Sequence, residues 1–546
     1  MKELIFGLIG GTALLMYGVE KMGNGLEKAS GELMRKILSV LTGKVWSAFL
    51  VGTFLTALVQ SSTAITVLTV GFVNAGLMKL PQAIGVIYGA NIGTTITAQL
   101  MAFSFHFKLT DIALPVLGLG FAISFLPKNR TVRHVGDAIM GFGMMFLGLK
   151  ILNSGVPFMQ GDPTLRSFFL NYASIPIVAI LLGIVATAAV HSSAATVGLV
   201  MVLGQAGLLD LRAAICIMFG DNIGTCITAQ LASVAGNIHA RRTAWAHTLY
   251  NVIGVLMAWV ALPWFVKIVE AGTVYIQPAG GIAAQIANSH TLFNVISAAL
   301  FLPFTKQYVK CIETVIRGKV EDQEINPVYT DKLLLDTPVA AMKAAILETA
   351  RTSTIARRMF AAVMQGFYKA DTASLERAER DEETLNDLQQ QVTQYIVEIS
   401  KRPLNHSESE MVPTLISGIN NVERIGDHSL SISRLAYEKM EKNLQFSKEA
   451  LDDLHGVETV IFMMFDKTIS VLESGDASGI AEVETMERDI DKLSEQIQDG
   501  HAKRLEEGRC TVGAGLIFLD VINYMERIAD HIVKTCAALG SFHSGA

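Results

Sequence analysis

Two short polar clusters interrupt long apolar stretches of the chain. The segment Gln60–Thr63 (Gln-Ser-Ser-Thr) lies inside the apolar run 46–77, and His191–Ser193 lies inside the run 173–203. As a helix, the first arm of the earlier run would measure about 22 Å, which is shorter than the roughly 30 Å hydrocarbon core of a bilayer. The spacing therefore favours re-entrant hairpins with hydroxyl residues at their tips. One long tilted helix, with its hydroxyls bonded to its own carbonyls, is the alternative.

The two clusters belong to an internal repeat. Residues 61–100 align without gaps to residues 192–231, and half of these 40 positions are identical. The best-matched block reads Asn-Ile-Gly-Thr-x-Ile-Thr-Ala-Gln-Leu in both copies. Repeated polar, glycine-interrupted segments within an apolar chain are typical of a transporter binding site. We expect unwound backbone at each Asn-Ile-Gly-Thr, because such backbone is tolerated in a membrane where it lines a cavity.

The number of apolar runs predicts an inverted arrangement. Between the two hairpins lie three of the seven predicted crossings, so the second hairpin would enter from the opposite face. The seven crossings are 4–22, 80–105, 110–127, 134–153, 208–235, 244–268 and 282–304. Most Lys and Arg residues of the connecting segments fall on the side of the C-terminal half. The positive-inside rule therefore places that half in the cytoplasm and the protein in the plasma membrane, the bacterial inner membrane.

The polar residues of both repeats define a candidate cavity without Lys or Arg. Its members are Gln60, Ser61, Ser62, Thr63, Asn91, Thr94, Thr95, Gln99, His191, Ser192, Ser193, Asp221, Asn222, Thr225 and Gln230. The helix that begins at each Ser-Ser pair would direct N–H groups and its dipole at an anion, which suits phosphate. Hydroxyl, amide and backbone oxygens also suit Na⁺. Cations bound nearby would offset the phosphate charge, which gives coupling a physical basis.

Two positions break the symmetry of the repeats. Asp221 stands where the first copy has an alanine, and an ionisable side chain at membrane depth is expected to hold a cation or a proton. A carboxylate bonded to local N–H groups at a cavity mouth is the alternative. His191 replaces a glutamine and would be either a pH sensor or a neutral, hydrogen-bonded imidazole. His247 and His290 are interpreted as structural.

The two halves of the chain differ in net charge. Residues 1–310 hold 19 Lys+Arg and 10 Asp+Glu, giving +9, and the remainder holds 25 and 40, giving −15. A charged content of only 17% excludes a disordered chain, and five cysteines without C-x-x-C spacing exclude a disulfide scaffold or zinc ribbon. We expect a transmembrane domain over 1–310, with repeats at about 1–127 and 128–310, a linker over 311–337 and a soluble domain over 338–546.

The acidic half has the pattern of a helical bundle. Amphipathic segments predict helices over 338–368, 372–401, 409–441, 448–473, 477–506 and 512–539. A second repeat, at an offset of 103, matches Glu-Arg-Ile-x-Asp-His at 423–428 with the same pattern at 526–531. Two three-helix units packed as one bundle are expected. The i, i+4 carboxylates of each copy share a helix face and could chelate a metal ion, or they form an exposed acidic face.

The first half resembles the type II sodium-phosphate cotransporter family. Gln60–Thr63 and Gly89–Thr94 are similar to that family's Gln-Ser-Ser-Ser and Gly-Ala-Asn-Ile-Gly-Thr motifs, and the second copy departs at His191, Ala194 and Asp221. The resemblance implies that phosphate is bound by Ser61, Ser62, Thr63, Ser192 and Ser193. It implies Na⁺ ligands among Gln60, Thr94, Thr95, Asn222, Thr225 and Thr228. The residue argument above adds Asn91, His191 and Asp221 to the sodium-binding set.

The second half resembles the PhoU family of phosphate-signalling helical bundles, over about residues 338–540. The resemblance rests on the duplicated Glu-Arg-Ile-x-Asp-His block and implies a regulatory role. Because some members bind iron or zinc, it also implies a metal site at Glu423, Asp427, Glu526 and Asp530.

The sequence thus predicts an all-α, polytopic membrane protein with inverted repeats and two re-entrant hairpins, followed by a soluble PhoU-like bundle. We expect it to be no enzyme but a carrier of inorganic phosphate, coupled to sodium ions and working by alternating access in the lipid bilayer. Its cytoplasmic domain would regulate it, a homodimer is allowed, and nucleic acid is not expected as a partner. A phosphate sensor that does not translocate and a phosphate exporter are the alternatives. A hydrolase using Ser192 or Ser193 with His191 is disfavoured, because adjacent residues at a helix start diverge.

Overall fold

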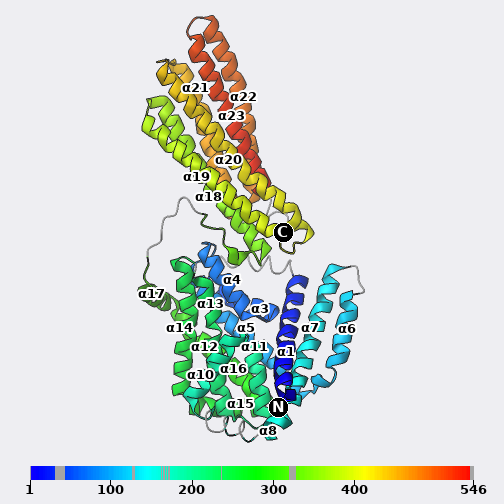
Figure 1. Cartoon of the computed structure of the whole chain (residues 1–546). Coiled ribbons are helices and arrows are strands. Elements are labelled where there is room, and N and C mark those ends of the chain that lie inside the picture. The colour runs from blue at the N-terminus through cyan, green and yellow to red at the C-terminus, as the bar shows by residue number, and fades with distance from the viewer. Residues whose placement is uncertain are drawn as a thin grey trace. The chain divides into compact units, whose positions relative to one another are not determined.

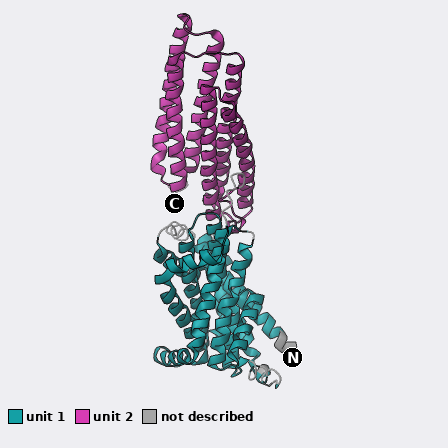
Figure 2. Cartoon of the chain, turned by 90° about the vertical axis from the view of Figure 1, so that its left-hand side faces the viewer, with its two compact units in different colours: residues 1–320 teal, residues 321–546 magenta. Residues whose placement is uncertain are grey.

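The computed structural model describes residues 2–30, 44–125, 129–161, 163, 167, 169, 173–234, 236–278, 280–318 and 327–540. All regular elements among these residues are helices (Figure 1), so the all-α class is confirmed. The chain divides into two compact units, Met1–Val320 and Glu321–Ala546 (Figure 2). Their boundary falls inside the expected linker, of which residues 319–326 lie outside the described part.

The first unit contains two sets of helices at equivalent places in the sequence repeat. The first set comprises α3 (Val45–Val59), α4 (Ser62–Asn74) and α5 (Leu80–His106). The second comprises α10 (Pro176–Val190), α11 (Ser193–Gln205), α12 (Leu211–Gly224) and α13 (Cys226–Ser233). In both sets the first helix packs extensively on the third, α3 on α5 and α10 on α12.

The other helices of this unit surround the two sets. They are α1 (Lys2–Ala29), α6 (Ala113–Phe125), α7 (Arg130–Ser154), α8 (Val156–Gly161), α14 (Ile238–Val260), α15 (Leu262–Ile276), α16 (Gly281–Phe301) and α17 (Thr305–Val315). α1 and α6 pack along α7, while α14 contacts α4, α5, α12 and α13, and α16 contacts α5, α11 and α12. Both α14 and α16 therefore touch helices of both repeats.

Glycines permit the close approach of the first and third helices in each set. A Cβ added at Gly89 of α5 would lie 2.1 Å from the carbonyl oxygen of Phe49 in α3. At the equivalent Gly220 of α12, it would lie 1.9 Å from the carbonyl oxygen of Ile180 in α10. Small residues at helix contacts let two backbones come together where apolar burial alone does not select a partner. The sequence repeat is thus also a packing repeat.

Fewer helices than expected are uniformly apolar over a membrane span. In the described chain, Arg130–Phe158 and Leu211–Ser233 are long and apolar enough to cross a bilayer, and the pair Ile238–Val260 and Leu262–Ile276, bent by 86°, would make a third. Seven crossings were expected. Long helices such as α5 carry polar side chains, and the hairpin arms have only 13 to 15 residues. The run 244–268 is not one helix, because a proline opens α15 at the bend.

The second unit is the expected six-helix bundle. Its helices are α18 (Pro338–Lys369), α19 (Thr372–Ser400), α20 (His406–Glu441), α21 (Lys448–Ser474), α22 (Ile480–Glu506) and α23 (Val512–Gly540). α18, α19 and α20 pack together, as do α21, α22 and α23, and the two sets meet through α20 with α23 and α18 with α21. Buried side chains including Phe360, Val422, Phe465 and Met525 form the shared core. Two three-helix units in one bundle are therefore confirmed.

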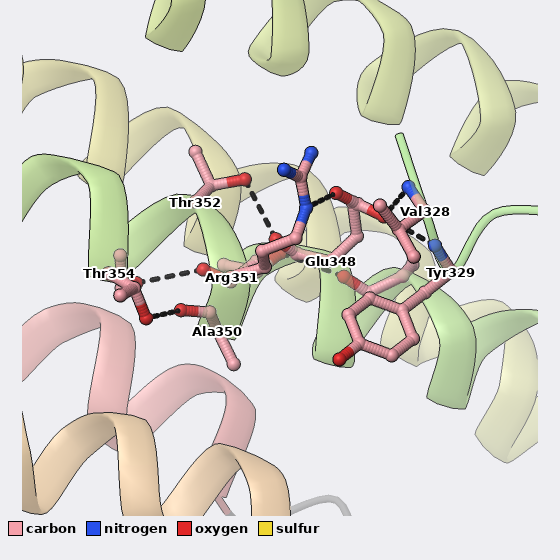
Figure 3. Close-up of polar contacts among 10 residues, drawn as sticks. Val328, Tyr329, Glu348, Ala350, Arg351, Thr352 and Thr354 are labelled. Carbon is pink, nitrogen blue, oxygen red and sulfur yellow. Dashed lines mark hydrogen bonds and ion pairs between the residues drawn. The ribbon is translucent and has the colours of Figure 1, made fainter. Parts of the chain in front are cut away.

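A buried carboxylate fixes the segment that enters this bundle (Figure 3). Glu348 of α18 is fully buried, and its Oε2 accepts hydrogen bonds from the backbone N–H groups of Val328 and Tyr329, both at 2.7 Å. The guanidinium of Arg351 donates to its Oε1 at 2.5 Å. Charge-assisted bonds of this kind are stronger than neutral ones. The chain from residue 328 onward is therefore held to the second unit.

Candidate functional site

Each expected hairpin tip is a two-residue break followed by a serine-capped helix. α3 ends at Gln60 (φ 59°, ψ 21°) and α10 ends at His191 (φ 56°, ψ 24°), both in the left-handed region that non-glycine residues seldom adopt. Ser61 and Ser192 are extended, and each side chain accepts a hydrogen bond from the backbone N–H three residues on, at 3.2 and 3.3 Å. The second arms thus begin at the Ser-Ser pairs as expected, and a single long helix is excluded.

The residues expected to bind phosphate lie at these two helix starts. Ser61 caps α4, whose first turn contains Ser62 and Thr63, and Ser192 caps α11, which begins at Ser193. All five side chains are partly exposed. The first N–H groups of a helix have no carbonyl partner within that helix and carry the positive end of its dipole. Each tip therefore combines hydroxyl donors with N–H groups suited to an oxyanion.

The first tip is fastened to the helix that follows it. Gln60 is only 8% exposed, and its Oε1 accepts a hydrogen bond from the Thr97 hydroxyl of α5 at 2.6 Å. Its amide nitrogen also donates to the carbonyl oxygen of Ala57. In the second repeat His191 is exposed, and Thr228, the equivalent of Thr97, donates to the Thr225 carbonyl of its own helix at 3.0 Å. The backbone of the tips is the same, but their anchoring differs.

The expectation of unwound backbone at Asn-Ile-Gly-Thr is wrong in the first repeat. α5 runs without a break through this segment, and the hydroxyls of Thr94 and Thr95 bond to carbonyls of the same helix at 3.0 and 2.7 Å. In the second repeat the only interruption is at Thr225, whose φ and ψ remain helical. A Cβ at Gly93 would lie 2.6 Å from the Thr53 carbonyl, so this glycine serves helix packing rather than unwinding.

Asp221 lies at the centre of a buried polar cluster that joins three helices. The Thr187 hydroxyl of α10 donates to Asp221 Oδ1 at 2.7 Å and lies 2.9 Å from the Thr196 hydroxyl of α11. Asp221 is fully buried, and within the described residues its Oδ2 has no hydrogen-bond partner. Burying a carboxylate costs several kcal/mol unless a positive partner accompanies it. The site is therefore suited to a cation or a proton, and the cavity-mouth alternative does not apply.

Further polar residues of the motif helices bond to α14 and α16. Asn91 Nδ2 donates to Asn251 Oδ1 at 2.9 Å, whereas Asn222 Nδ2 donates to the Met218 carbonyl of its own helix at 3.0 Å. Gln99 Nε2 donates to Thr291 Oγ1 at 2.9 Å, and the equivalent Gln230 donates to Thr248 Oγ1 at 2.7 Å. These contacts fix the position of α14 and α16 against the motif helices.

Sequence reasoning missed these partners, although the chain contains a signal for them. Residues 247–253 read His-Thr-Leu-Tyr-Asn-Val-Ile, and residues 290–296 read His-Thr-Leu-Phe-Asn-Val-Ile, identical at six of seven positions. The bonded threonines and Asn251 all belong to this short repeat. A search for self-similarity at an offset of 43 would have found it. Thr187 and Thr196 carry no comparable signal, because an isolated threonine in an apolar helix is common.

The metal site expected in the second unit stays a prediction. No group of three or more His, Cys, Asp or Glu side chains is placed to hold a metal ion anywhere in the described ranges. Glu423 and Asp427 lie on α20, and Glu526 and Asp530 lie on α23. Burial, followed by the charge of Asp427, raises the pKa of Glu423. Burial, followed by the charges of Asp491 and Asp530, raises that of Glu526.

Family models match both units. The model described as Na⁺/Pi-cotransporter matches residues 14–154 and 158–278, and the model described as PhoU domain matches residues 349–436 and 458–539. The first pair of ranges contains both hairpin tips, and the second contains both copies of the Glu-Arg-Ile-x-Asp-His block. The resemblances drawn from the motifs are therefore confirmed at the level of the families.

Curated relatives agree with both matches. The chain is 33% identical to "Uncharacterized protein YqeW" of Bacillus subtilis, over 57% of this chain and 99% of that protein. It is 25% identical to "Putative inorganic phosphate export protein YjbB" of Escherichia coli O157:H7, over 96% of this chain and 95% of that protein. It is 29% identical to "Sodium-dependent phosphate transport protein 2A" of Rattus norvegicus, over 33% of this chain and 28% of that protein.

Proposed function

The chain belongs to the Na⁺/Pi-cotransporter family, with PhoU domains in its second unit, and on this basis we propose that it moves inorganic phosphate across the plasma membrane coupled to Na⁺. The observation that carries this proposal is the pair of tips with the same backbone, each a left-handed break followed by a serine-capped helix. Two such tips supply hydroxyl and N–H donors to one oxyanion from two sides, and alternating access would open the site to each face in turn.

Phosphate would be held by neutral donors alone. Ser61, Ser62 and Thr63 from one tip and Ser192 and Ser193 from the other supply hydroxyls, and the two helix starts supply N–H groups. A Lys or Arg side chain would add a permanent charge that has to be released in every cycle. Donors without net charge let the anion leave once its accompanying cations leave. This arrangement suits a carrier better than a tight receptor.

Sodium ions would supply the compensating charge. Oxygen ligands come from Gln60, Asn91, Thr94 and Thr95 in the first repeat and from Asp221, Asn222, Thr225 and Thr228 in the second, with His191 beside the second tip. Asp221 contributes most, because its buried carboxylate has one oxygen without a partner among the described residues. Its cluster joins α12 to Thr187 of α10 and Thr196 of α11. A cation there would hold together both arms of the second hairpin, so cation occupancy and tip position would be linked.

The second unit would regulate the carrier from the cytoplasm, and export is the second candidate for the direction of flux. The relative named as a putative inorganic phosphate export protein matches over 96% of this chain, which includes the PhoU domains. The sodium-dependent relative matches over 33%. Since a carrier follows the combined gradients of its substrates, the same site serves either direction.

Purified full-length protein in liposomes tests the proposal. We expect radiolabelled phosphate to accumulate when Na⁺ is imposed outside and not when choline replaces it. The double variant Ser61→Ala/Ser192→Ala should lower this uptake at least about 10-fold, because two charge-assisted donors to the anion are lost. Ser47→Ala is the matched control, since its exposed hydroxyl bonds only to the Lys44 carbonyl on the first arm of the same hairpin. Phosphate binding without flux under any gradient would instead identify a sensor.

A further inference from the structure

The short repeat lets α14 pack on α5 in the same way as α16 packs on α12. On α14, the Tyr250 ring lies 4.6 Å from the Tyr88 ring of α5. On α16, the Phe293 ring lies 5.0 Å from the Phe219 ring of α12. Tyr88 and Phe219 are equivalent in the long repeat, and Tyr250 and Phe293 are equivalent in the short one. The contact of α14 with α5 is therefore the counterpart of the contact of α16 with α12.

The same short repeat also bonds each helix to the other half of the unit. Thr248 of α14 accepts a hydrogen bond from Gln230 of α13, and Thr291 of α16 accepts one from Gln99 of α5. Each helix therefore contacts one repeat through its aromatic residue and the other repeat through its threonine. These two contacts fix the position of each helix along its neighbours. Residues at the same place in the short repeat are therefore expected to meet residues at the same place in the long repeat.

The asparagines of the short repeat break this equivalence. Asn251 Oδ1 accepts a hydrogen bond at 2.9 Å from Asn91, the asparagine of the first motif. By register, Asn294 corresponds to Asn251 and would meet Asn222 of the second motif. Asn222 instead donates its amide nitrogen to its own helix, and Asn294 Oδ1, fully buried, has no partner among the described residues. A buried acceptor without a donor costs about 1–3 kcal/mol.

The orientation of the Asn294 amide is set by a bond. Its Nδ2 donates to the carbonyl oxygen of His290 at 2.9 Å. Turning the amide over would bring two oxygens together and would leave the NH₂ group buried without an acceptor. The unpartnered atom is therefore the oxygen, and a cation or a hydrogen-bond donor that enters from outside the chain would satisfy it.

We propose that Asn294 Oδ1 is a ligand of a coupling Na⁺ bound between α12 and α16. In the first repeat, the NH₂ group of Asn91 occupies the corresponding position. The inference rests on the proposed function and adds a residue outside the sodium-binding set expected from the sequence. Asn222, whose nitrogen is already bonded, has an amide oxygen as its remaining polar atom and would be a second ligand. Neutral amide ligands suit a monovalent ion, since divalent ions in proteins are bound mainly with carboxylates.

Three variants of the full-length protein separate a ligand from a structural role. Asn294→Leu removes the oxygen and keeps the number and branching of the side-chain heavy atoms. Asn294→Asp keeps an oxygen at this position and removes the donor to His290. Ser289→Ala, elsewhere on α16, removes a buried hydroxyl that lies 2.7 Å from the Ile286 carbonyl of its own helix and 3.4 Å from the Met218 sulfur of α12, and it serves as the matched control.

Two measurements are made on each variant. One is the Na⁺ concentration that gives half-maximal phosphate uptake in liposomes. The other is the rise in unfolding temperature that Na⁺ produces over K⁺ in detergent without phosphate. For Asn294→Leu we expect the half-maximal concentration to rise at least about 10-fold and the Na⁺-specific stabilisation to disappear. Asn294→Asp should keep the stabilisation, and Ser289→Ala should keep wild-type values of both.

Any result other than these would overturn the inference. If Asn294→Leu keeps the wild-type Na⁺ dependence, the oxygen is not a ligand. If Asn294→Asp loses Na⁺-specific stabilisation together with Asn294→Leu, the side chain acts through its bond to His290. Should the leucine variant fail to fold, the aspartate variant alone decides between these two roles. If wild-type protein transports phosphate with no dependence on Na⁺, the proposed function itself fails. The wild-type measurement alone shows this failure, so it cannot be confused with a failure of the Asn294 proposal, which only the variants test.

Discussion

The two hairpins of the first unit share a backbone but not the side chains that hold them. Gln60 and His191 end the first arms with nearly identical dihedral angles, and Ser61 and Ser192 cap the second arms in the same way. Yet Gln60 is buried and bonded to α5, whereas His191 is exposed. A capping serine and a packing glycine are enough to set the backbone of each tip, so the two tips keep the same backbone although their other side chains differ. We infer that the first tip is the more rigid of the two.

Buried charge shows the same contrast. Thr187 is bonded to Asp221, while the equivalent Thr56 is buried with no partner among the described residues, since the first repeat has Ala90 where a carboxylate would stand. The third member, Thr196, is replaced by Ile65. The first repeat therefore lacks two of the three groups of the cluster. The repeats would share the phosphate, and the second would carry most of the cation chemistry.

The largest effect is expected from moving the carboxylate between repeats. Asp221→Asn should reduce Na⁺-driven phosphate uptake about 100-fold, about 2.7 kcal/mol, because the negative charge that compensates the cation is lost. Ala90→Asp combined with Asp221→Asn should not restore uptake, since Ile65 stands where the second hydroxyl of the cluster would be. Uptake is measured in liposomes at several Na⁺ concentrations. Full recovery in the double variant would mean that the two repeats are interchangeable and that the difference in buried charge between them does not affect transport.

A second prediction tests what the repeats have in common. Gly89→Ala and Gly220→Ala should each lower the free energy of unfolding by about 2 kcal/mol, because a Cβ would lie 2.1 and 1.9 Å from a carbonyl oxygen of the neighbouring helix. Unfolding temperatures in detergent measure both changes. Gly272, which is half-buried and whose added Cβ would meet nothing within 4 Å, is the control. If only one of the two buried variants is destabilised, the packing repeat does not hold equally in both halves.

The sequence predicted the parts of the structure that depend on local chemistry. The helix starts at Ser61 and Ser192 and the six helices of the second unit follow from capping residues and apolar periodicity, and both are confirmed. The prediction of unwound backbone at the motif was wrong because a glycine in a helix can mark either a break or a close contact with another helix. The sequence does not show which helix lies against the glycine, so it cannot distinguish the two. Similarly, Thr187, which bonds to Asp221, lies 34 residues earlier in the chain, and Thr196, whose hydroxyl lies 2.9 Å from that of Thr187, lies 25 residues earlier. Residue spacing does not predict this cluster.

A third prediction concerns the anchoring of the first tip. Thr97→Val removes the donor to Gln60 and should cost about 1 kcal/mol of stability, since a buried acceptor is left without that bond. Thr228→Val in the second repeat should cost less, because Thr228 bonds only to a carbonyl of its own helix. Unfolding temperature measures stability, and hydrogen exchange at the start of α4 measures the anchoring. Equal exchange at α4 and α11 in the wild type would contradict a more rigid first tip.

The second unit offers the opposite case, in which equivalent residues of a repeat meet each other. His428 and His531 occupy the same place in the Glu-Arg-Ile-x-Asp-His copies, and their rings stack at 5.4 Å between α20 and α23. The ring nitrogen Nδ1 of His531 also lies 3.0 Å from the Asn421 side-chain oxygen. A change in one copy therefore acts directly on the other copy.

The smallest effect is expected from this histidine pair. Burial, then the nearby His428, Lys534 and Arg424, lowers the pKa of His531 to about 4 against 6.5 when unfolded, and Asp530 opposes the shift. Because the unfolded chain binds the proton more readily, the contribution to stability is present above pH 6.5 and is lost as the pH falls toward 4. The ring is partly exposed, so the loss should be about 1 kcal/mol or less. Hydrogen exchange in α20 and α23 at pH 7 and pH 5 measures it, after correction for the intrinsic pH dependence of exchange. His531→Asn should remove most of the difference, and an unchanged difference would place the pH response in other groups of the bundle.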